Sequence, residues 1–283
     1  MGITPDKFTD DDLHAMQRVI LGILKDIDAT CRRHGLRYYI IAGTMLGAIR
    51  HGGFVPWDDD ADVAMPRPDY EKLIEHADEW LPSHLELVSS HSDPSYPYLF
   101  ARIQDRRTTY ILRRRFNFIG GVPVDVFPID GMVLDAEKMK SHYRRFAFRK
   151  RLLYYSEIDR LKHGYGLHWA FTTLFQLLTN RSKLHRKADI VQREFDYETS
   201  PLLADHDNKP SRGVYKRTVF GTPTPVKFED TTLMGVERPD EYLRISYGDY
   251  MTPPAQHPLL NFRYLDLDTP YAEFIEKHKN FRI

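Results

Sequence analysis

The 283-residue sequence has little cysteine, no net charge and no long apolar run. Its single cysteine, Cys31, cannot form an internal disulfide, which excludes a disulfide scaffold and favours a reducing compartment. No apolar run approaches the roughly 18–20 residues that span a bilayer. The first residues, MGITPDKFTDDDL, are acidic and lack a hydrophobic signal region. We therefore expect a cytoplasmic globular protein, long enough for one large domain or two small ones.

The balance of 40 Lys+Arg against 40 Asp+Glu conceals a basic segment. Residues 138–187 contain 13 basic and two acidic residues, so they carry +11 and the rest of the chain −11. Within them, HYRRFAFRKRLLYY interleaves basic and aromatic residues, and a nearly uncharged apolar stretch follows. Such a segment suits either an anionic membrane surface or an ordinary solvated helical subdomain, and both interpretations stay open. Nucleic acid is disfavoured because no recognition motif accompanies the basic residues.

Local patterns predict an α/β core followed by a largely helical region. Thr9 and the acids after it predict a capped helix start, and Gly35 predicts the end of that helix. Further helices are predicted from Pro68 to about Trp80, after Asp135, and near 240–247. Strands are predicted at 36–42, 60–65, 85–89, 97–103, 107–112 and 122–127, with a β-like section at 214–236.

Four of the five residues in the run DDDAD are acidic. If this run is extended, Asp58, Asp60 and Asp62 project from one face, and like charges so close repel unless a cation lies among them. Mg²⁺ favours such carboxylate oxygens, completed by water and phosphate. A calcium-binding EF-hand would need Gly and Glu where Val63 and Asp69 stand. An acidic surface turn without a ligand is the other alternative, and the apolar residues that follow disfavour it.

A further acid, Asp125, lies in the middle of the β-type run VPVDVF. An acid in such a run is costly unless it has a partner. Considered alone, a salt bridge with one of the arginines explains Asp125. Considered with Asp60 and Asp62, a shared metal ion is the better account.

The residues before the acidic run fit a phosphate site. A strand leading through Gly43 and Thr44 into a helix start offers free N–H groups to an anion, and Arg50 offers a bidentate contact. Gly-Thr after a strand is common by itself. It gains weight because it comes sixteen residues before Asp60.

The order of these features resembles the nucleotidyltransferase fold. The segments AGTMLGAIRHGGFVPWDDDADVAMPRPDYEKL, PVDVFPIDG and YLRISYGDYMTPP resemble the LicD family of bacterial phosphocholine transferases, to which fukutin-related protein is distantly similar. The resemblance runs from about Leu36 to Pro254. It implies a nucleotidyltransferase-like mixed sheet core over 1–134, in the α/β (α+β) class, and a helical, basic region over 135–283 that completes the acceptor side. The zinc site of fukutin-related protein uses cysteine, and a chain with one cysteine cannot reproduce it.

The resemblance also implies an activity. The family transfers a phosphorylated alcohol from a CDP-activated donor to a sugar hydroxyl, releases CMP, and uses Mg²⁺, with Mn²⁺ as a possible substitute. By this resemblance Asp60 and Asp62 would bind the metal with Asp125 as the third acid, and Asp58 would bind metal or act as general base. The donor is expected to be CDP-choline, and the acceptor a cell-surface glycan such as lipopolysaccharide or a teichoic acid precursor.

Donor binding follows from the same resemblance. Gly43 and Thr44 would hold the donor phosphates, while Arg50 and Trp57 match motif positions without an assigned role. A choline headgroup calls for an aromatic cage. The candidates for that cage are Trp57, Phe116, Phe118, Phe127, Tyr154 and Tyr155, although most aromatic residues of the chain belong to the core.

Two alternatives to this activity stay open on the sequence. The same fold can transfer a nucleotide to a protein or small molecule, which would release pyrophosphate rather than CMP. The chain can also be a non-catalytic glycan-binding relative. Glycan acceptors of the family are typically linked to a lipid carrier, which would place residues 138–187 at the inner membrane face as a peripheral contact.

Overall fold

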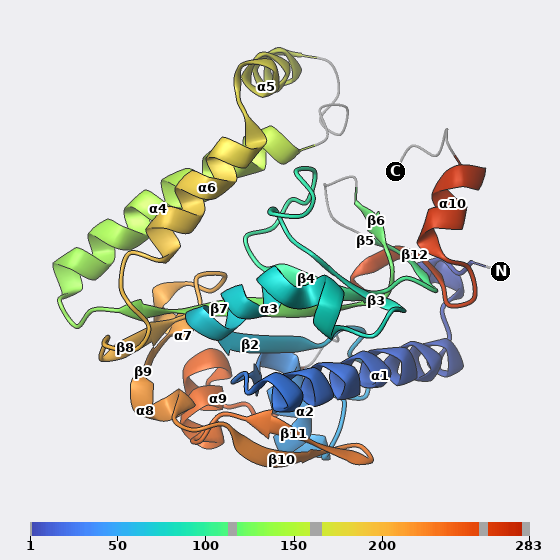
Figure 1. Ribbon diagram of the computed structural model, residues 1–283, viewed down its shortest axis with the longest axis horizontal. Helices are drawn as coiled ribbons and strands as arrows, with labels where there is room; N and C mark the ends of the chain where they lie inside the picture. Colours follow the sequence, from blue (N-terminus) through green and yellow to red (C-terminus); the bar gives the residue numbers. More distant parts are fainter. Residues whose placement is uncertain (1, 113–117, 159–165, 255–259, 279–283) are drawn as a thin grey trace.

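A mixed sheet forms the centre of the protein in the computed structural model, which describes residues 2–112, 118–158, 166–254 and 260–278 (Figure 1). The strands lie in the order β1-β2-β7-β4-β3, and β8 and β9 continue from the far end of β7. Only β2 and β7 are parallel neighbours. The predicted α/β class with a mixed sheet is confirmed. The strands are β1 (Tyr39–Ile40), β2 (Asp62–Pro66), β3 (Leu85–Val88), β4 (Ala101–Asp105), β7 (Pro123–Met132), β8 (Leu202–Ala204) and β9 (Val214–Lys216).

The long helix α1 (Asp10–His34) packs on β4 and β7 and begins and ends where the sequence predicts. The Thr9 side chain accepts the Asp12 N–H at 3.2 Å, and the Asp12 carboxylate accepts the Thr9 N–H at 3.0 Å, so the cap is reciprocal. Gly35 ends the helix with a left-handed φ of 65°. The helices α2 (Ala42–His51) and α3 (Arg67–Trp80) also lie against the sheet, and a short 3₁₀ turn covers Pro5–Lys7.

Several predicted strands are shorter or shifted. The predicted strand 36–42 is reduced to β1, because Ala42 takes a left-handed φ of 48° and already begins α2. The strand predicted at 97–103 starts only at Ala101, and β7 extends five residues beyond its predicted end at Phe127. Two smaller sheets complete the β structure. They pair β10 (Thr224–Phe228) with β11 (Thr231–Gly235), and β12 (Phe262–Asp266) with β5 (Thr109–Leu112), which in turn pairs with β6 (Ile119–Gly120).

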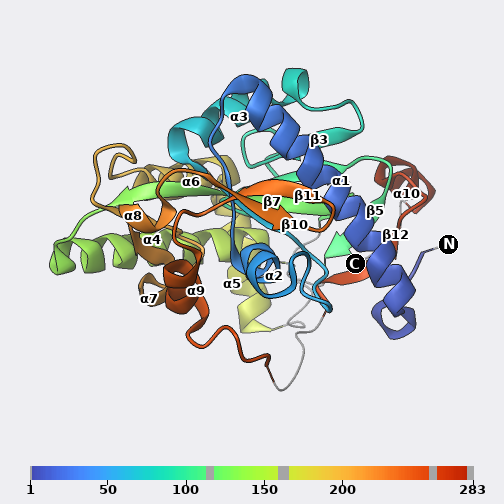
Figure 2. The same cartoon turned by 90° about the horizontal axis from the view of Figure 1, so that it is seen from below.

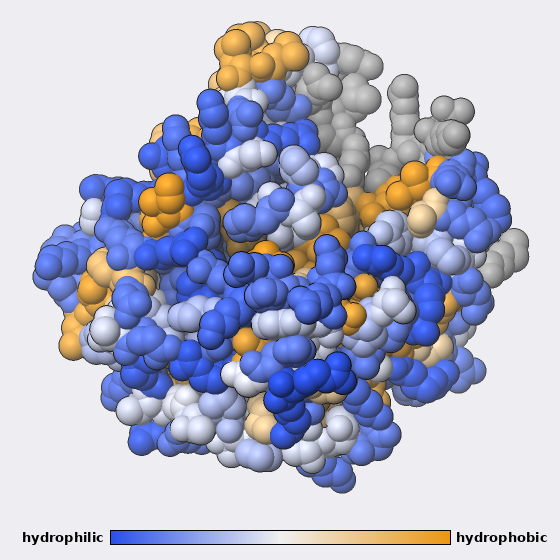
Figure 3. All heavy atoms as spheres, in the orientation of Figure 1, coloured by the Kyte–Doolittle hydropathy of each residue, from blue (hydrophilic) through white to orange (hydrophobic). Residues whose placement is uncertain are grey.

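The second half of the chain is helical from α4 to α6, as predicted, whereas the described residues between 202 and 266 contain the five strands β8 to β12 between short helices. Asp135 caps α4 by accepting two backbone N–H groups, and α4 and α6 lie side by side and extend away from the sheet (Figures 1 and 2). At their outer end lies α5, where apolar side chains gather on the surface (Figure 3). None of the helices in the described ranges combines the length and apolar character of a transmembrane segment. The helices are α4 (Ala136–Glu157), α5 (Leu167–Leu178), α6 (Arg181–Gln192), α7 (Pro210–Gly213), α8 (Arg217–Phe220), α9 (Pro239–Tyr247) and α10 (Tyr271–Lys277).

The two halves share their sheets. β8 pairs with the end of β7, and β12 pairs with β5. The division at 134/135 therefore stays a prediction about folding units, and strands from both sides of it lie in the same sheets.

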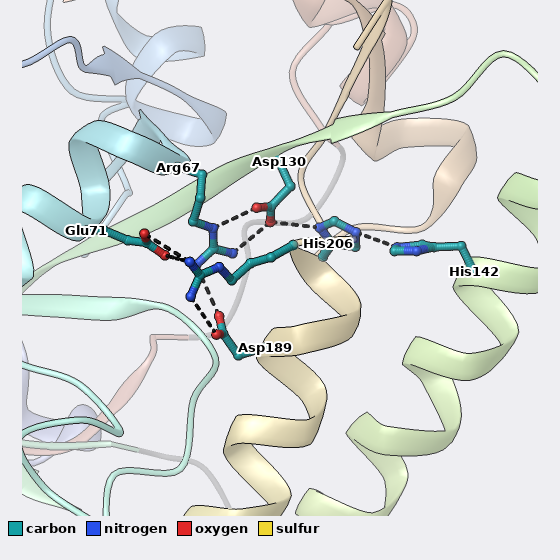
Figure 4. Close-up of polar contacts among 7 residues, drawn as sticks. Arg67, Glu71, Asp130, His142, Asp189 and His206 are labelled. Carbon is teal, nitrogen blue, oxygen red and sulfur yellow. Dashed lines mark hydrogen bonds and ion pairs between the residues drawn. The ribbon is translucent and has the colours of Figure 1, made fainter. Parts of the chain in front are cut away.

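A row of buried polar side chains joins α4 and α6 to the sheet (Figure 4). Arg67, the first residue of α3, donates two hydrogen bonds of 2.6 and 2.7 Å to Asp130 of β7, and lies 3.2 Å from Asp189 of α6. Asp130 also contacts His206 at 3.3 Å, whose ring lies 2.8 Å from that of His142 on α4. Burial works to raise the pKa of Asp130, but Arg67 and His206 outweigh it and lower that pKa to about 2.

Candidate active site

The parallel pairing of β2 and β7 brings two of the predicted acids together. Its register places Asp62, the first residue of β2, directly opposite Asp125. The Asp125 N–H donates a 3.0 Å hydrogen bond to the carbonyl of Ala61. Two acids 63 positions apart in the sequence thus meet on adjacent strands, as the hypothesis of a shared cation requires.

The acids just before β2 form a second part of the cluster. One carboxylate oxygen each of Asp58, Asp59 and Asp60 lies within 4.8 Å of the others, the arrangement of a candidate metal site. Asp59 is the buried member, and Asn261 donates its backbone N–H to it at 2.6 Å. The Asn261 side-chain amide donates to Asp59 at 3.0 Å and to Asp60 at 2.9 Å. The most compact trio in the described chain is therefore 58–60.

These carboxylates lie in surroundings that disfavour their charge. Burial, together with the charges of the neighbouring acids, raises the pKa values of Asp60 and Asp62 well above their ordinary range. Burial and the charge of Asp59 raise the pKa of Asp58 to about 6. A cation among the acids would relieve this repulsion. A set of carboxylate oxygens alone is what Mg²⁺ or Mn²⁺ binds, so the residues present fit the predicted metal.

Asp125 differs from the other acids because it already has a cationic partner. The buried guanidinium of Arg102 donates to its two oxygens at 2.6 and 3.0 Å. This is the salt bridge that the sequence left open as the simpler explanation of Asp125. Each oxygen keeps a second acceptor direction, so a metal-ligating role for Asp125 stays a prediction, now for a carboxylate whose charge Arg102 shares.

The start of α2 lies against the acids, as the phosphate hypothesis expects. The buried Thr44 hydroxyl accepts the Asp62 N–H at 2.8 Å, so Thr44 fixes the backbone of that acid and keeps its own proton to donate. Gly43 and Thr44 are in the first turn of α2, where N–H groups lack intrahelical acceptors. Ala42 holds its strained left-handed backbone while donating its N–H to the Tyr242 hydroxyl at 3.0 Å.

An added methyl group is expected to have different effects at two glycines of α2. A Cβ atom at Gly43 would lie 2.5 Å from the Asp58 Oδ2, the movable end of a side chain, whereas one at Gly47 would lie 2.3 Å from the carbonyl oxygen of Gly53. We expect Gly43→Ala to keep the fold and to lower activity about tenfold or more by displacing that carboxylate. Gly47→Ala should lower the unfolding free energy by about 1–3 kcal/mol. Urea unfolding and a transfer assay on both variants check this, and equal unfolding losses would contradict it.

A cavity of about 300 Å³ opens beside the carboxylates. Four of the predicted site residues line it: Gly43, Arg50, Trp57 and Asp58. Its remaining lining is Leu46, Val55, Tyr247, Asp249, Tyr250, Thr252 and Pro254. The cavity unites residues that the sequence predicted separately as phosphate, motif and acid positions.

Polar and aromatic groups shape this cavity. The Arg50 guanidinium donates to the Tyr250 carbonyl at 2.8 Å and lies 5.9 Å from the centre of the Trp57 ring. Tyr247 lines the cavity together with Asp58, and its partial burial with the charges of Asp62, Asp58 and Asp60 raises the pKa of its phenol. The cavity and the carboxylates are therefore one continuous site.

Sequence reasoning missed several residues of this site. Tyr247 and Tyr250 stand in the segment YLRISYGDYMTPP, which supported the resemblance but received no roles. Arg102 and Asn261 carried no signal, because only the fold brings them to Asp125 and Asp60. Among the described candidates for an aromatic cage, Trp57 lines the cavity and Phe118, Phe127, Tyr154 and Tyr155 do not, while Phe116 lies outside the described residues.

Comparison with known proteins agrees with this geometry. Residues 35–157 match the family model described as "LicD/FKTN/FKRP, nucleotidyltransferase domain". This segment is therefore similar to a LicD nucleotidyltransferase domain. The predicted resemblance to the LicD family is thereby confirmed.

The similarity to individual proteins extends beyond residues 35–157. The chain is 28% identical over 257 residues to the lipopolysaccharide cholinephosphotransferase LicD of Haemophilus influenzae, covering 86% of this chain and 93% of that protein. Uncharacterized proteins of Rickettsia prowazekii and Rickettsia typhi are each 38% identical over 47 residues, 17% of this chain and 18% and 15% of their own lengths. The segment that matches the family model contains all the predicted acids, whereas the cavity residues Tyr247 and Tyr250 lie outside it.

Proposed function

We propose that the protein transfers a phospho-alcohol, phosphocholine in the first place, from a CDP-activated donor to a sugar hydroxyl of a cell-surface glycan and releases CMP. The observation that carries this proposal is the cavity beside the acids, which joins a helix start, an arginine and aromatic rings to a carboxylate cluster. The similarity to the lipopolysaccharide cholinephosphotransferase of Haemophilus influenzae supports a transferase activity. Lipopolysaccharide or a teichoic acid precursor is the proposed acceptor class.

The chain's own residues account for most of the proposed mechanism. Asp60 and Asp62, with Asp58 or Asp125, would hold Mg²⁺, which when bound neutralises the donor phosphates. The first N–H groups of α2, at Gly43 and Thr44, can donate hydrogen bonds to an anion. The positive end of the helix dipole attracts the same anion. Donor phosphate held there lies next to the carboxylates because α2 packs against β2.

A general base is available in the same cluster. With no cation among the acids, burial and the charge of Asp59 raise the pKa of Asp58 to about 6. A bound cation would lower that pKa again, which leaves Asp58 a charged carboxylate able to accept a proton at neutral pH. Asp58 borders the cavity, so it can take the proton of an acceptor hydroxyl that attacks donor phosphate bound there. Arg50, which also lines the cavity, supplies positive charge to the leaving CMP.

The aromatic lining predicts a preference for a choline headgroup. Trp57 and Tyr247 offer π faces that attract a quaternary ammonium, which glycerol and ribitol lack. We expect Trp57→Ala to raise the KM for CDP-choline about tenfold and to change the KM for CDP-glycerol much less. Trp80→Ala is the matched control. Trp80 of α3 stacks on His34 of α1 and on His76 of α3, and it does not line the cavity. Equal KM changes for both donors would remove the choline assignment.

Calorimetric titration tests the proposed function directly. CDP-choline, CDP-ethanolamine, CDP-glycerol and CDP-ribitol are each titrated with and without Mg²⁺, and one of them is expected to bind selectively and only with Mg²⁺. Turnover with the purified acceptor glycan should release CMP. Release of pyrophosphate from a nucleoside triphosphate would instead establish nucleotide transfer, and glycan binding without turnover or metal would establish the non-catalytic alternative.

A further inference from the structure

The helix α5 has its polar and apolar sides reversed relative to an ordinary surface helix. Its buried residue is Thr172, and its Gln176 amide points inward and donates to the carbonyls of Tyr155 and Ile158 at 3.1 and 2.9 Å. Its leucines face outward. In the described chain, five of the twelve exposed large apolar residues lie on this one helix: Leu167, Phe171, Leu174, Leu177 and Leu178.

This orientation is held by specific contacts with α4. Gln176 satisfies carbonyl groups at the end of α4, which have no partner within that helix. Phe171 and Phe175 pack around the ring of Tyr155, at centroid distances of 5.6 and 6.3 Å. The anchored side is thus polar and aromatic, and the side left to solvent is a stripe of leucines, the reverse of what water alone favours.

The exposed charged residues of α4 and α6 toward their α5 end are basic, and the acid there, Glu157, is buried and lies 3.4 Å from Arg181. Arg151 lies one turn before Tyr155 on α4, and Lys183, Arg186 and Lys187 lie on α6, all four exposed. α5 itself contains no Asp, Glu, Lys or Arg. A second copy of this chain would bring these cations against one another, so the charge favours an anionic partner over self-association.

We propose that α5 is a membrane-docking helix that lies in the headgroup region of an anionic bilayer, with the cations of α4 and α6 facing lipid phosphates. At 12 residues, α5 is about 18 Å long, too short to cross a bilayer and suited to lying along its surface. It lies at the outer end of α4 and α6, where the apolar patch of Figure 3 faces away from the sheet. This proposal does not depend on the transferase assignment.

Vesicle sedimentation tests it with single substitutions. The full chain is mixed with phosphatidylcholine vesicles that contain or lack phosphatidylglycerol, and tighter binding to the anionic vesicles is expected. Leu177→Asp should weaken that binding about tenfold or more, because it places an acid at the lipid surface. Leu134→Asp is the matched control: Leu134 is 70% exposed and Leu177 75%, but Leu134 precedes α4 at its other end.

Further variants and controls separate the possible outcomes. Arg151→Gln with Lys183→Gln should weaken binding to the anionic vesicles roughly thirtyfold, at about 1 kcal/mol for each cation near the surface. Circular dichroism should show both leucine variants folded, and Leu174→Asp repeats the test at a second position of the stripe. The proposal is overturned if the wild type binds neither kind of vesicle, or if Leu177→Asp and Leu134→Asp behave alike. It is also overturned if Leu177→Asp changes only the oligomeric state measured by sedimentation velocity.

Discussion

Asp62→Asn is expected to lower the proposed transfer by on the order of a thousandfold, because the loss of a ligand to the proposed metal would remove about 4 kcal/mol of transition-state stabilisation. The amide is isosteric, and the Asp62 backbone keeps its hydrogen bond to Thr44. The change also removes one charge from a repelling group, since burial and Asp60 raise the pKa of this acid. The melting temperature without metal should therefore be equal or higher. Steady-state transfer and thermal unfolding measure the two effects.

Asp78→Asn provides the matched control for that experiment. Asp78 is an exposed acid of α3, outside the carboxylate cluster. Its variant should turn over normally, and its melting temperature should rise with Mg²⁺ as that of the wild type does, while that of Asp62→Asn should not. Near-normal turnover of Asp62→Asn would remove the metal assignment, whatever the donor proves to be.

The largest expected loss of stability comes from Arg67→Met, which keeps the bulk of the side chain and removes its charge. It leaves Asp130, with 1% of its side chain exposed, without the guanidinium that donates two hydrogen bonds to it. Breaking a buried ion pair from one side costs about 3–5 kcal/mol. Urea unfolding at neutral pH measures this loss. A loss below about 1 kcal/mol would show that His206 alone compensates Asp130.

The stability lost in Arg67→Met is expected to depend on pH, because it comes from the ion pair between Arg67 and Asp130. Arg67 and His206 lower the folded-state pKa of Asp130 to about 2 against the opposing effect of burial, whereas the unfolded chain has an ordinary carboxyl of about 3.9. A lowered pKa contributes stability above the unfolded value and loses it as the pH falls toward the folded value. The difference between wild type and Arg67→Met should thus shrink between about pH 4 and 2. Arg32→Met, which removes an exposed ion pair with Asp28, should cost about 0.5 kcal/mol or less.

The sequence predicted the features that depend on local chemistry. The cap at Thr9, the end at Gly35 and the cap at Asp135 were all predicted from residues within one turn of the helix terminus. The meeting of Asp62 with Asp125 was predicted from the cost of unpaired acids in apolar runs. The metal itself and the roles of the individual acids stay predictions.

The remainder of the site depends on contacts between distant parts of the chain. Asn261 reaches Asp60 across 201 positions, and Tyr242 reaches Ala42 across 200. No local pattern marks such partners, because an asparagine or tyrosine at those positions fits many environments equally well. The early start of α2 has the same origin, since Ala42 takes a left-handed conformation that its own side chain disfavours and that Tyr242 helps to hold.

The helices α4 and α6 also set how far the proposed chemistry would take place from a membrane surface. α4 has 22 residues and is about 33 Å long; its first turn follows β7, and its last turn holds α5. With α5 on a bilayer, α4 acts as a spacer that holds the sheet and its carboxylates away from the lipid. Arg67 joins the sheet to α6 through Asp189, and Asp130 joins it to α4 through His206 and His142. An acceptor would then be reached in the part of a glycan that projects from the membrane, so the position of a sugar along its chain, as well as its chemistry, would decide whether it is modified.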